Sequence, residues 1–302
     1  MNKQDHILKK LRQIEILPTF PKIVAEILTL INDPMSSASD LARHMDPSMA
    51  GEVLRIANTA YFGTRSFRSI TTIERGIAVI GYEHLANVIL QMPFLGMIQG
   101  SDETFDKRLF ITHAITCGML SKLIGSMAVG LADHNEIYIS GILHDIGRII
   151  MYRYFKAEWQ EMMALIKGRH APALAAENEV FGVDHGHVGA SLLELWNLPS
   201  AIINGVRYHH LPDQATEDKE SAYATWLGNQ LSKRIDLEAD LAGFDEFAAK
   251  HREFCQLMKD CNGMLASHDE VKFLSEAYEC LRNAKGLIDV TTGSDDTGPG
   301  SR

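Results

Sequence analysis

The run Gly141-Ile142-Leu143-His144-Asp145-Ile146-Gly147 places a histidine and an aspartate side by side at the C-terminal end of an apolar helix predicted over 136–145. Gly147 follows as a residue type that commonly caps a helix. Neighbouring side chains on a helix point about 100° apart. The pair can therefore serve two closely spaced metal ions, or one ion and the groups that support its ligands.

Further inward histidines lie at three other places along the chain. His113 is on the apolar face of a helix predicted over 106–125, and His185 is on the buried face of a later helix. The adjacent pair His209 and His210 ends a third helix. A lone inward histidine is usually a hydrogen-bonded core residue, and this holds for His113 taken by itself. The ordered set of five histidines and one aspartate predicts a metal site, or at least descent from one.

The ligand atoms in this set are imidazole nitrogens and a carboxylate oxygen, which suit Fe, Mn, Zn, Co or Ni. The four cysteines show no Cys-x-x-Cys spacing, which disfavours both a thiolate zinc site and a disulfide framework. No signal peptide is visible, and no apolar run reaches the ~18 residues that a membrane span requires. We therefore expect a cytoplasmic protein with reduced thiols and one or two divalent ions, with Fe, Mn, Zn or Ni as the candidates.

The net charge of −10 is unevenly distributed. Residues 211–302 carry 18 acids and 10 bases, a net of −8, which leaves −2 for the first 210 residues. Nucleic-acid binding needs clustered Lys and Arg, so an acidic chain without a basic stripe is a poor candidate. The stretch 36–60 resembles a helix-turn-helix, but its second helix offers Arg55 without a basic cluster. We expect this stretch to pack in a helical lobe, and the chain to bind a protein partner or a small ligand.

The run 141–147 resembles the signature of the HD superfamily of metal-dependent phosphohydrolases. More specifically, the stretch 17–210 resembles the HDOD family, regulatory relatives of the HD-GYP cyclic di-GMP phosphodiesterases. The matching pieces are Leu17-Pro18-Thr19-Phe20-Pro21, Arg55 to Gly63, Ile73 to Gly81, Glu177 with Phe181 to His185, Trp196 to Pro199, and Tyr208-His209-His210.

The resemblance implies a bacterial signalling role and an all-α fold, which agrees with helical periodicity almost throughout the chain. It also implies a set of candidate metal ligands, namely His113, His144, Asp145, His185, His209 and His210. The candidate catalytic residues are Asp145, as a bridge between two metals, and Arg148, as a holder of phosphate.

The predicted organisation is an N-terminal helical lobe over 1–100, packed against an HD-like helical lobe over 101–212. Acidic helices follow over 213–290. The last stretch, 291–302, is rich in Gly, Ser and Asp and is predicted to be a disordered tail. No convincing strand pattern is present, so the expected fold is a multi-helix, all-α architecture.

Three departures from the family pattern bear on activity. Active HD proteins place a last aspartate on a later helix, whereas the helix predicted over 222–231 offers Asn229. Arg148 stands where HD-GYP enzymes have a phosphate-holding lysine, and it keeps the charge with a different geometry. After His210 comes the run 211–213, Leu-Pro-Asp, and not the Glu and Gly-Tyr-Pro loop of the phosphodiesterases.

Two functions are consistent with this pattern. The favoured hypothesis is a signal-output or adaptor protein that binds a signalling partner or a nucleotide-type ligand, with a degenerate metal site and no turnover. The alternative is a metal-dependent phosphohydrolase or phosphodiesterase acting on nucleotides or cyclic dinucleotides. Metal content and a screen of phosphodiester substrates would separate the two.

Overall fold

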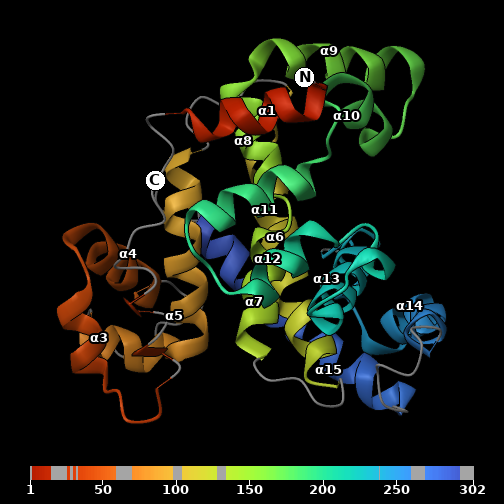
Figure 1. Cartoon of the computed structure of the whole chain (residues 1–302). Coiled ribbons are helices and arrows are strands. Elements are labelled where there is room, and N and C mark those ends of the chain that lie inside the picture. The colour runs from red at the N-terminus through yellow and green to blue at the C-terminus, as the bar shows by residue number, and fades with distance from the viewer. Residues whose placement is uncertain are drawn as a thin grey trace, which may run out of the picture. The chain divides into compact units, whose positions relative to one another are not determined.

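The computed structural model describes residues 2–14, 26–27, 30–31, 33–58, 70–97, 104–127, 134–237, 239–259 and 269–292 (Figure 1). All elements within these ranges are helical and none is a strand, which confirms the predicted all-α fold. Residues 17–21, one of the pieces that carry the family resemblance, and most of the predicted tail lie outside the described residues.

The chain divides into two compact units. The first consists of residues 1–17 and 100–284, and the second of residues 18–99 and 285–302. The second unit contains α3 (Ala38–His44), α4 (Pro47–Ala57) and α5 (Ile73–Met97), and both α3 and α4 pack against α5.

Local signals in the sequence explain where the helices of the second unit begin and end. Ser37 and Asp40 form a reciprocal capping box at the start of α3. Gly81 interrupts α5 with a φ of 77°, a left-handed conformation that favours glycine. Arg55 is bound to Glu52 at 2.6 Å and is not part of a basic cluster. These contacts favour a packing role for the stretch 36–60 over the binding of DNA.

The first unit contains the remaining helices (Figure 1). In chain order these are α1 (Lys3–Arg12), α6 (Lys107–Gly125), α7 (His134–Leu143), α8 (Ile146–Tyr154), α9 (Lys156–Arg169), α10 (Ala173–Phe181), α11 (His185–Leu195), α12 (Ser200–Arg207), a 3-10 turn (Pro212–Gln214), α13 (Lys219–Ser232), α14 (Phe244–Lys259) and most of α15 (Glu270–Thr292). Helix α1 was not expected, and it packs on α10 and α11.

Helix α6 is packed between α7 and α13. Glycines allow these backbones to come close, since a Cβ added at Gly141 would lie 2.7 Å from the Cα of Gly118. A Cβ added at Gly228 would lie 2.2 Å from the Oγ of Ser121. Because α6 carries His113 and α13 carries Asn229, this tight packing fixes the distance between the two helices that border the site.

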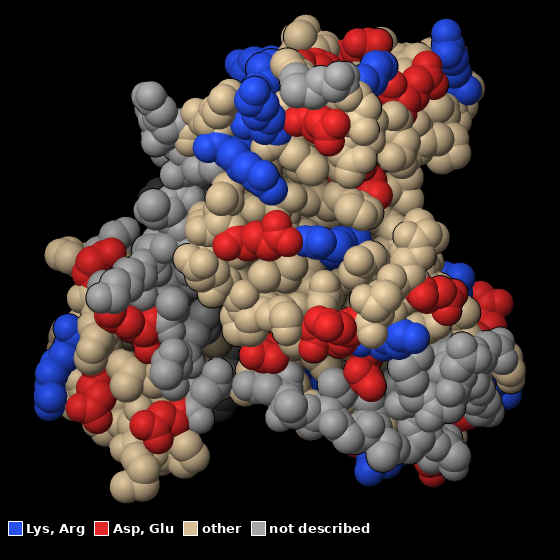
Figure 2. Space-filling model, in the orientation of Figure 1, with Lys and Arg blue, Asp and Glu red and all other residues tan. Residues whose placement is uncertain are grey.

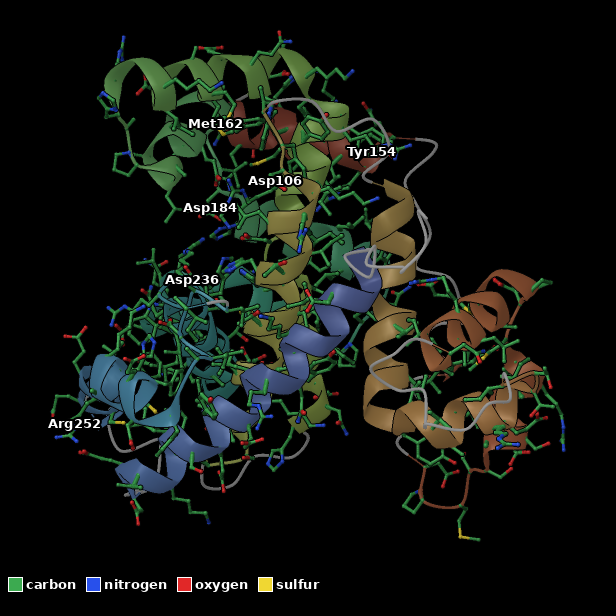
Figure 3. The ribbon with its side chains drawn as sticks, turned by 180° about the vertical axis from the view of Figure 1, so that it is seen from behind. Asp106, Tyr154, Met162, Asp184, Asp236 and Arg252 are labelled. Carbon is green, nitrogen blue, oxygen red and sulfur yellow. The ribbon has the colours of Figure 1, made fainter. Side chains whose placement is uncertain are left out.

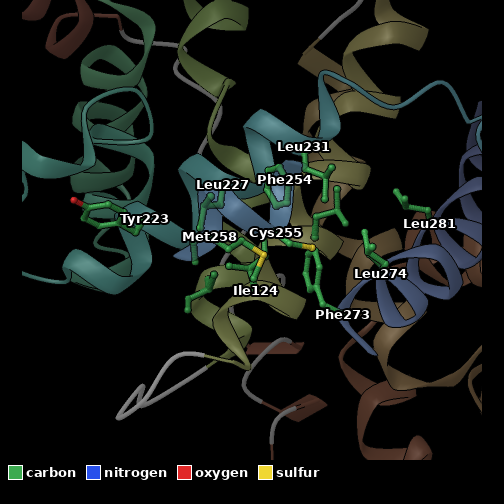
Figure 4. Packing of buried hydrophobic residues seen from close by; sticks show 14 of the residues in the cluster. Ile124, Tyr223, Leu227, Leu231, Phe254, Cys255, Met258, Phe273, Leu274 and Leu281 are labelled. Atoms are coloured by element: carbon green, nitrogen blue, oxygen red, sulfur yellow. The ribbon is translucent and has the colours of Figure 1, made fainter. Parts of the chain in front are cut away.

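The C-terminal helices bury a separate part of the core (Figure 4). Side chains from α6, α13, α14 and α15 meet there, among them Ile124, Leu227, Leu231, Phe254, Met258, Phe273, Leu274 and Leu281. The acidic helices predicted after residue 212 therefore bury their apolar faces within the first unit, against α6 and one another.

Two side chains show how packing decides exposure. His251 is 3% exposed, because it lies on the buried face of α14 and its Nε2 is 3.2 Å from the Oδ2 of Asp240. Leu109 on α6 is 66% exposed. Leu109 borders a pocket, which explains why an apolar residue is tolerated there.

On the face shown in Figure 2, Lys and Arg side chains are interspersed with Asp and Glu. The described residues of that face therefore do not form the broad basic surface that nucleic-acid backbones require. None of the described helices is both long and apolar enough to cross a membrane. Cys117 is a buried, free thiol.

Candidate metal centre

His144 and Asp145 are the two residues of a tight turn between the end of α7 at Leu143 and the start of α8 at Ile146. Gly147 was expected as a helix cap but lies in the first turn of α8. Its role is to allow close packing, since a Cβ there would lie 1.9 Å from the carbonyl oxygen of His185. The turn thus points the His-Asp pair toward α11, whose first residue is His185.

The structure brings all six candidate ligands together in two neighbouring groups. The first triad is His113, His144 and Asp145, and the second triad is His185, His209 and His210. Within each triad the ligand atoms lie within 4.8 Å of one another. Side chains separated by up to 97 positions in the chain, from His113 to His210, therefore share one cluster, and their role as metal ligands stays a prediction.

Asp145 lies between the two triads. Its Oδ1 is 2.8 Å from the Nε2 of His185 and 3.8 Å from the Nε2 of His209. Its Oδ2 is 3.9 Å from the Nε2 of His113 and 3.7 Å from an Nη of Arg148. The same Oδ1 lies 3.5 Å from the Nε2 of His144, so this oxygen faces both triads, while Oδ2 faces His113 and Arg148. This is the position expected of a carboxylate shared by two ions ~3.5–4 Å apart.

Contacts on the outer side of the rings decide which nitrogen faces the cluster. The Nδ1 of His144 lies 2.8 Å from the carbonyl of Gly141, and the Nδ1 of His209 lies 2.6 Å from the carbonyl of Val206. A carbonyl only accepts, so each Nδ1 carries the hydrogen and each Nε2 turns a lone pair to the centre. Backing of this kind is usual for metal-ligating histidines.

The same reasoning applies to His113. The hydroxyl of Ser232 donates to the carbonyl of Asn229 at 3.0 Å and therefore accepts from the Nδ1 of His113 at 3.3 Å. The Nε2 of His113 is then also a lone pair, and it lies only 3.1 Å from the Nε2 of His144. Two lone pairs at this distance repel unless a cation lies between them. The donor set of the first triad therefore fits a metal ion.

Electrostatics keeps most of these rings neutral. Burial lowers the pKa of His144 to about 3, although Asp145 opposes the effect. Burial likewise lowers the pKa of His210 to about 2, with the neighbouring His209 adding to it. Neutral imidazole is the form that binds a metal.

His185 differs because two carboxylates face it. Its Nδ1 is 2.7 Å from Glu177, and its Nε2 contacts Asp145. Burial by itself would lower the pKa of His185, but Glu177 and Asp145 raise it to about 9. Without a metal, His185 therefore holds a proton on Nε2, and a cation at this nitrogen would replace that proton. Glu177 was quoted in the sequence only as part of a family motif, and its position behind His185 was not predicted.

The HDOD domain model matches residues 17–212 of the chain. The chain belongs to the HDOD family. A curated relative, an uncharacterised protein of Treponema pallidum (strain Nichols), is 25% identical over 233 residues. This match covers 75% of the chain and 44% of the relative, so the chain spans less than half the length of the curated protein it matches.

Solved structures share the HDOD fold. An HDOD domain protein with unknown function from Geobacter sulfurreducens superposes with a TM-score of 0.68 at 19% identity, covering 94% of this chain and 98% of that one. A candidate phosphohydrolase from Shewanella amazonensis SB2B gives 0.65 at 21% identity, covering 93% and 97%. A candidate signal transduction protein from Marinobacter aquaeolei VT8 gives 0.67 at 17% identity, covering 95% and 66%. At these identities the likeness shows the fold.

Asn229 of this HDOD protein is fully buried on α13. Neither its amide oxygen nor its amide nitrogen has a hydrogen-bond partner in the described part of the chain. An interaction with Asn229 is among the influences on the pKa of His113, after burial, which lowers it. The residue expected to replace the last aspartate therefore lies beside the first triad.

A pocket of about 540 Å³ adjoins the first triad. His113, Asp145 and Arg148 line it, whereas no residue of the second triad does. It also takes in the start of α6 and the segment after α13, whose neighbourhoods are marked by Asp106 and Asp236 in Figure 3.

The wall of this pocket combines positive charge with aromatic surface. Lys233 and Arg148 supply the charge, and Phe105, Phe110 and Trp159 supply the rings. The Nε1 of Trp159 already donates to the hydroxyl of Thr104, and the side chain is 3% exposed, so Trp159 offers a ligand little surface and no free donor. Lys233 and the aromatic residues were not singled out from the sequence, because only the fold brings them beside Asp145.

Proposed function

We propose that this HDOD protein is a bacterial, cytoplasmic signal-output protein that binds a divalent metal at the histidine and aspartate cluster and a small anionic ligand in the adjoining pocket. The observation that carries this proposal is the convergence of five imidazoles and Asp145 beside a pocket lined by Arg148 and Lys233. A protein partner would recognise the ligand-bound form of the chain.

The ligand that best matches the pocket carries a phosphate group and a planar ring. Arg148 and Lys233 at one end suit phosphate oxygens. Phe105 stacks on Tyr152 with ring centroids 4.9 Å apart, and Phe105, Phe110 and Trp159 line the pocket, where a planar group could pack. Nucleotide-type molecules have both features.

Two features of the chain favour binding of a ligand over its hydrolysis. Asn229 is neutral where active HD proteins have a carboxylate, so the cluster has less negative charge to hold two ions. The residues after His210 form a 3-10 turn at Pro212–Gln214, in the place where the phosphodiesterases carry their Gly-Tyr-Pro loop. Both features weaken the machinery for generating hydroxide without preventing metal binding.

The first test is the metal content of protein purified without chelator. We expect at least one Fe, Mn, Zn or Ni ion per chain by elemental analysis, and a loss of metal in the His144→Ala and His209→Ala variants. AMP, as a probe with a phosphate and a planar ring, should bind to the loaded protein and bind less tightly to the Arg148→Met variant. A chain that purifies with no stoichiometric metal, and takes up none on dialysis, would end the proposal.

A second function, a metal-dependent phosphohydrolase, is favoured by one observation. The pocket opens on Asp145 and Arg148, the carboxylate that lies between the triads and the cation 3.7 Å from it. A structure from Shewanella amazonensis SB2B with a TM-score of 0.52 is described as a candidate metal-dependent phosphohydrolase.

This alternative is tested with bis-p-nitrophenyl phosphate, nucleotides and cyclic dinucleotides. Metal-dependent turnover that disappears in His144→Ala would replace the binding role with hydrolysis. Here Asp145 would hold ions, Arg148 would hold phosphate, and the buried histidines would stay neutral. We expect binding of AMP without release of phosphate.

A further inference from the structure

One wall of the pocket comes from the irregular connection between α13 and α14. We call residues 233–237 and 239–242 of this connection the wall segment. Three of its side chains line the pocket, namely Lys233, Ile235 and Leu237. The residues between them have partners elsewhere, since Arg234 pairs with Glu253 on α14 at 3.6 Å and Asp236 takes part in a turn with Asp240. The wall segment therefore faces the pocket on one side and α14 on the other.

A buried carboxylate fastens the wall segment. Asp240 is 5% exposed, and its Oδ2 accepts from the backbone nitrogen of Asp236 at 2.9 Å and from the Nε2 of His251 at 3.2 Å. Its Oδ1 accepts from the Nζ of Lys250. A buried carboxylate is costly unless it is well bonded. One side chain thus closes the turn that follows the pocket-lining residues and joins that turn to α14.

Helix α15 holds the same turn at a second point. The hydroxyl of Tyr278 donates to the carbonyl of Leu241 at 3.1 Å, and its ring packs against Phe247 of α14 with centroids 5.4 Å apart. Ile235 and Leu237 pack against the apolar cluster of the C-terminal helices. The position of this part of the pocket wall therefore depends on α14 and α15, although neither helix lines the pocket.

The contact between Asp240 and His251 is weakened by acid. A carboxylate only accepts, so the hydrogen of neutral His251 lies on Nε2, and a further proton would have to go to the buried Nδ1. The charges that act on the ring are Asp240 and Arg234 from the wall segment and Lys250 from its own helix. Burial lowers the pKa of His251 below its usual 6.5, although Asp240 opposes the effect. Protons therefore favour conformations in which His251 has left this contact.

We propose that Asp240 and His251 are positioning residues of the pocket, which hold the wall segment against a bound ligand and release it in acid. The proposal rests on the proposed function, because it takes ligand binding in the pocket as given. A ligand that contacts Lys233, Ile235 and Leu237 binds more tightly to the held form of the wall segment. By linkage, the ligand favours that form by the same factor, so ligand binding and protonation of His251 oppose each other.

The first experiment measures AMP binding to the full, metal-loaded chain by calorimetry at pH 7.5. Asp240→Asn should raise the Kd of AMP about fivefold, and Tyr278→Phe, which keeps the ring, about threefold, in the range expected for losing one supporting hydrogen bond. Asp245→Asn is the matched control, because it makes the same change at an exposed position of α14 and should leave the Kd unchanged. Metal content should be equal in all four proteins, since no changed residue belongs to the two triads.

A pH profile tests a consequence that a purely structural role does not have. The Kd of AMP is compared at pH 7.5 and pH 5.5 in the wild type and in His251→Gln, at matched metal occupancy. Glutamine keeps a donor for Asp240 and does not titrate. The Kd should rise about threefold more in the wild type than in the variant, because only the wild type releases the wall segment on protonation. AMP and the cluster histidines titrate in both proteins, so the ratio of the two Kd values cancels their contribution.

A third measurement needs no variant. Hydrogen exchange of the Zn²⁺-loaded wild type, followed by mass spectrometry, should slow about threefold in the peptide over 233–242 when AMP is added, because the bonds between Asp236 and Asp240 open less often. Exchange in α3 should not change, since none of its residues lines the pocket.

The outcomes distinguish this inference from the proposed function. If the metal-loaded wild type binds no AMP, the proposed function fails and this inference fails with it. If AMP binds the wild type, Asp240→Asn and Asp245→Asn equally well, the pocket binds its ligand and the positioning role is wrong. Should Asp240→Asn not fold, an unchanged Kd in Tyr278→Phe together with unchanged exchange in the wall segment would overturn the proposal. An equal rise of Kd with acid in the wild type and in His251→Gln would overturn the release by protonation.

Discussion

At the scale of single residues, the cluster depends on groups that hold the ligands from behind. Glu177 is completely buried on α10 and contacts both the backbone nitrogen and the Nδ1 of His185. A buried carboxylate is costly unless it is well bonded, and here His185 provides the bonds. Glu177 thereby orients the imidazole and makes its Nε2 a stronger electron-pair donor toward a metal ion. This places Glu177 among the positioning residues of the site.

We expect Glu177→Gln to weaken metal binding at the second triad by about 10- to 100-fold, the usual cost of losing such a partner. The amide keeps the size of the side chain and can still accept from His185, so the fold should persist. Competition for Zn²⁺ against a chelator of known affinity measures the loss. Glu179→Gln is the control, because Glu179 is exposed and pairs with Arg169. Equal affinities in the two variants would contradict the positioning role.

At the scale of helices, the site depends on how closely α8 approaches α11. Gly147 contacts the backbone at His185 and Gly189, and a Cβ there would lie 1.9 Å from the carbonyl oxygen of His185. Because that neighbour is backbone, it cannot rotate away as a flexible side chain would. Any side chain at this position must therefore push α11 outward and move His185 from Asp145.

Gly147→Ala should accordingly lower the free energy of unfolding by about 3 kcal/mol, at the upper end of the cost of overpacking. It should also reduce metal content, because His185 shifts. Gly168→Ala is the control, since no atom lies within 4 Å of the added Cβ in α9. That change should be neutral or stabilise by up to about 1 kcal/mol. Chemical denaturation of both variants checks the prediction, and a Gly147→Ala protein as stable as the wild type would refute it.

Sequence patterns predicted the helices that are long and periodic more reliably than the contacts between them. The helix predicted over 106–125 is α6, within one residue, because its apolar stripe is regular. The predicted helix over 136–145 ends at Leu143, since the His-Asp pair needs a turn to face α11. Helix α1 was missed although Asn2 caps it and Ile7 is buried, because the short segment is rich in charge.

The candidate site was predictable as a ligand list but not as a geometry. Order along the chain marked His113 and Asp145, whereas the two-triad arrangement follows from four loops and helices meeting in space. Lys233 and Thr116 carry no local signal, since a lysine after a helix or a threonine within one is ordinary. Only packing of α13 on α6 brings them to the same pocket.

At the scale of the whole molecule, metal binding links elements that are far apart in the sequence. The ligands lie on α6, on the turn after α7, at the start of α11 and after α12, all within the first unit. A ligand that binds only the folded chain stabilises it by RT ln(1 + [L]/Kd). The metal should therefore stabilise the first unit as a whole.

Removal of the metal with a chelator should lower the Tm of the protein, by an amount equivalent to about 2.7 kcal/mol if the ion was present at 100 times its Kd. His209→Ala should show a low Tm that chelator does not lower further. His6→Gln, on the exposed side of α1, should respond to chelator as the wild type does. Differential scanning calorimetry measures the three proteins. A Tm of wild-type protein that ignores chelator would show that no metal supports the fold.

The C-terminal helices add a pH dependence that is independent of the cluster. His251 on α14 is buried and faces Asp240, with Lys250 and Arg234 as the other charges that act on it. Burial lowers the pKa of His251 below its usual 6.5, although Asp240 opposes the effect. The unfolded chain therefore takes up this proton at a higher pH than the folded chain does, and folding stability falls as pH drops below 6.5.

The pKa of Asp240 changes stability in the same direction at lower pH. Burial raises it, but the hydrogen bond from Lys250 and other contacts lower it below 3.8 overall. Its contribution is thus complete above pH 3.8 and is lost as the pH falls through the lower folded value. The two groups titrate in separate windows, so between pH 7.5 and pH 5 the histidine accounts for the change at this pair.

His251→Gln should remove that part of the slope, because glutamine keeps a donor for Asp240 and does not titrate. We expect the difference in unfolding free energy between wild type and variant to shrink or change sign as the pH falls from 7.5 to 5, in the direction that favours the variant at low pH. Urea denaturation at several pH values, with the metal state held constant, measures this difference and cancels the contribution of the cluster histidines. A difference that stays constant across this range would mean that the pKa of His251 is the same in the folded and unfolded chains.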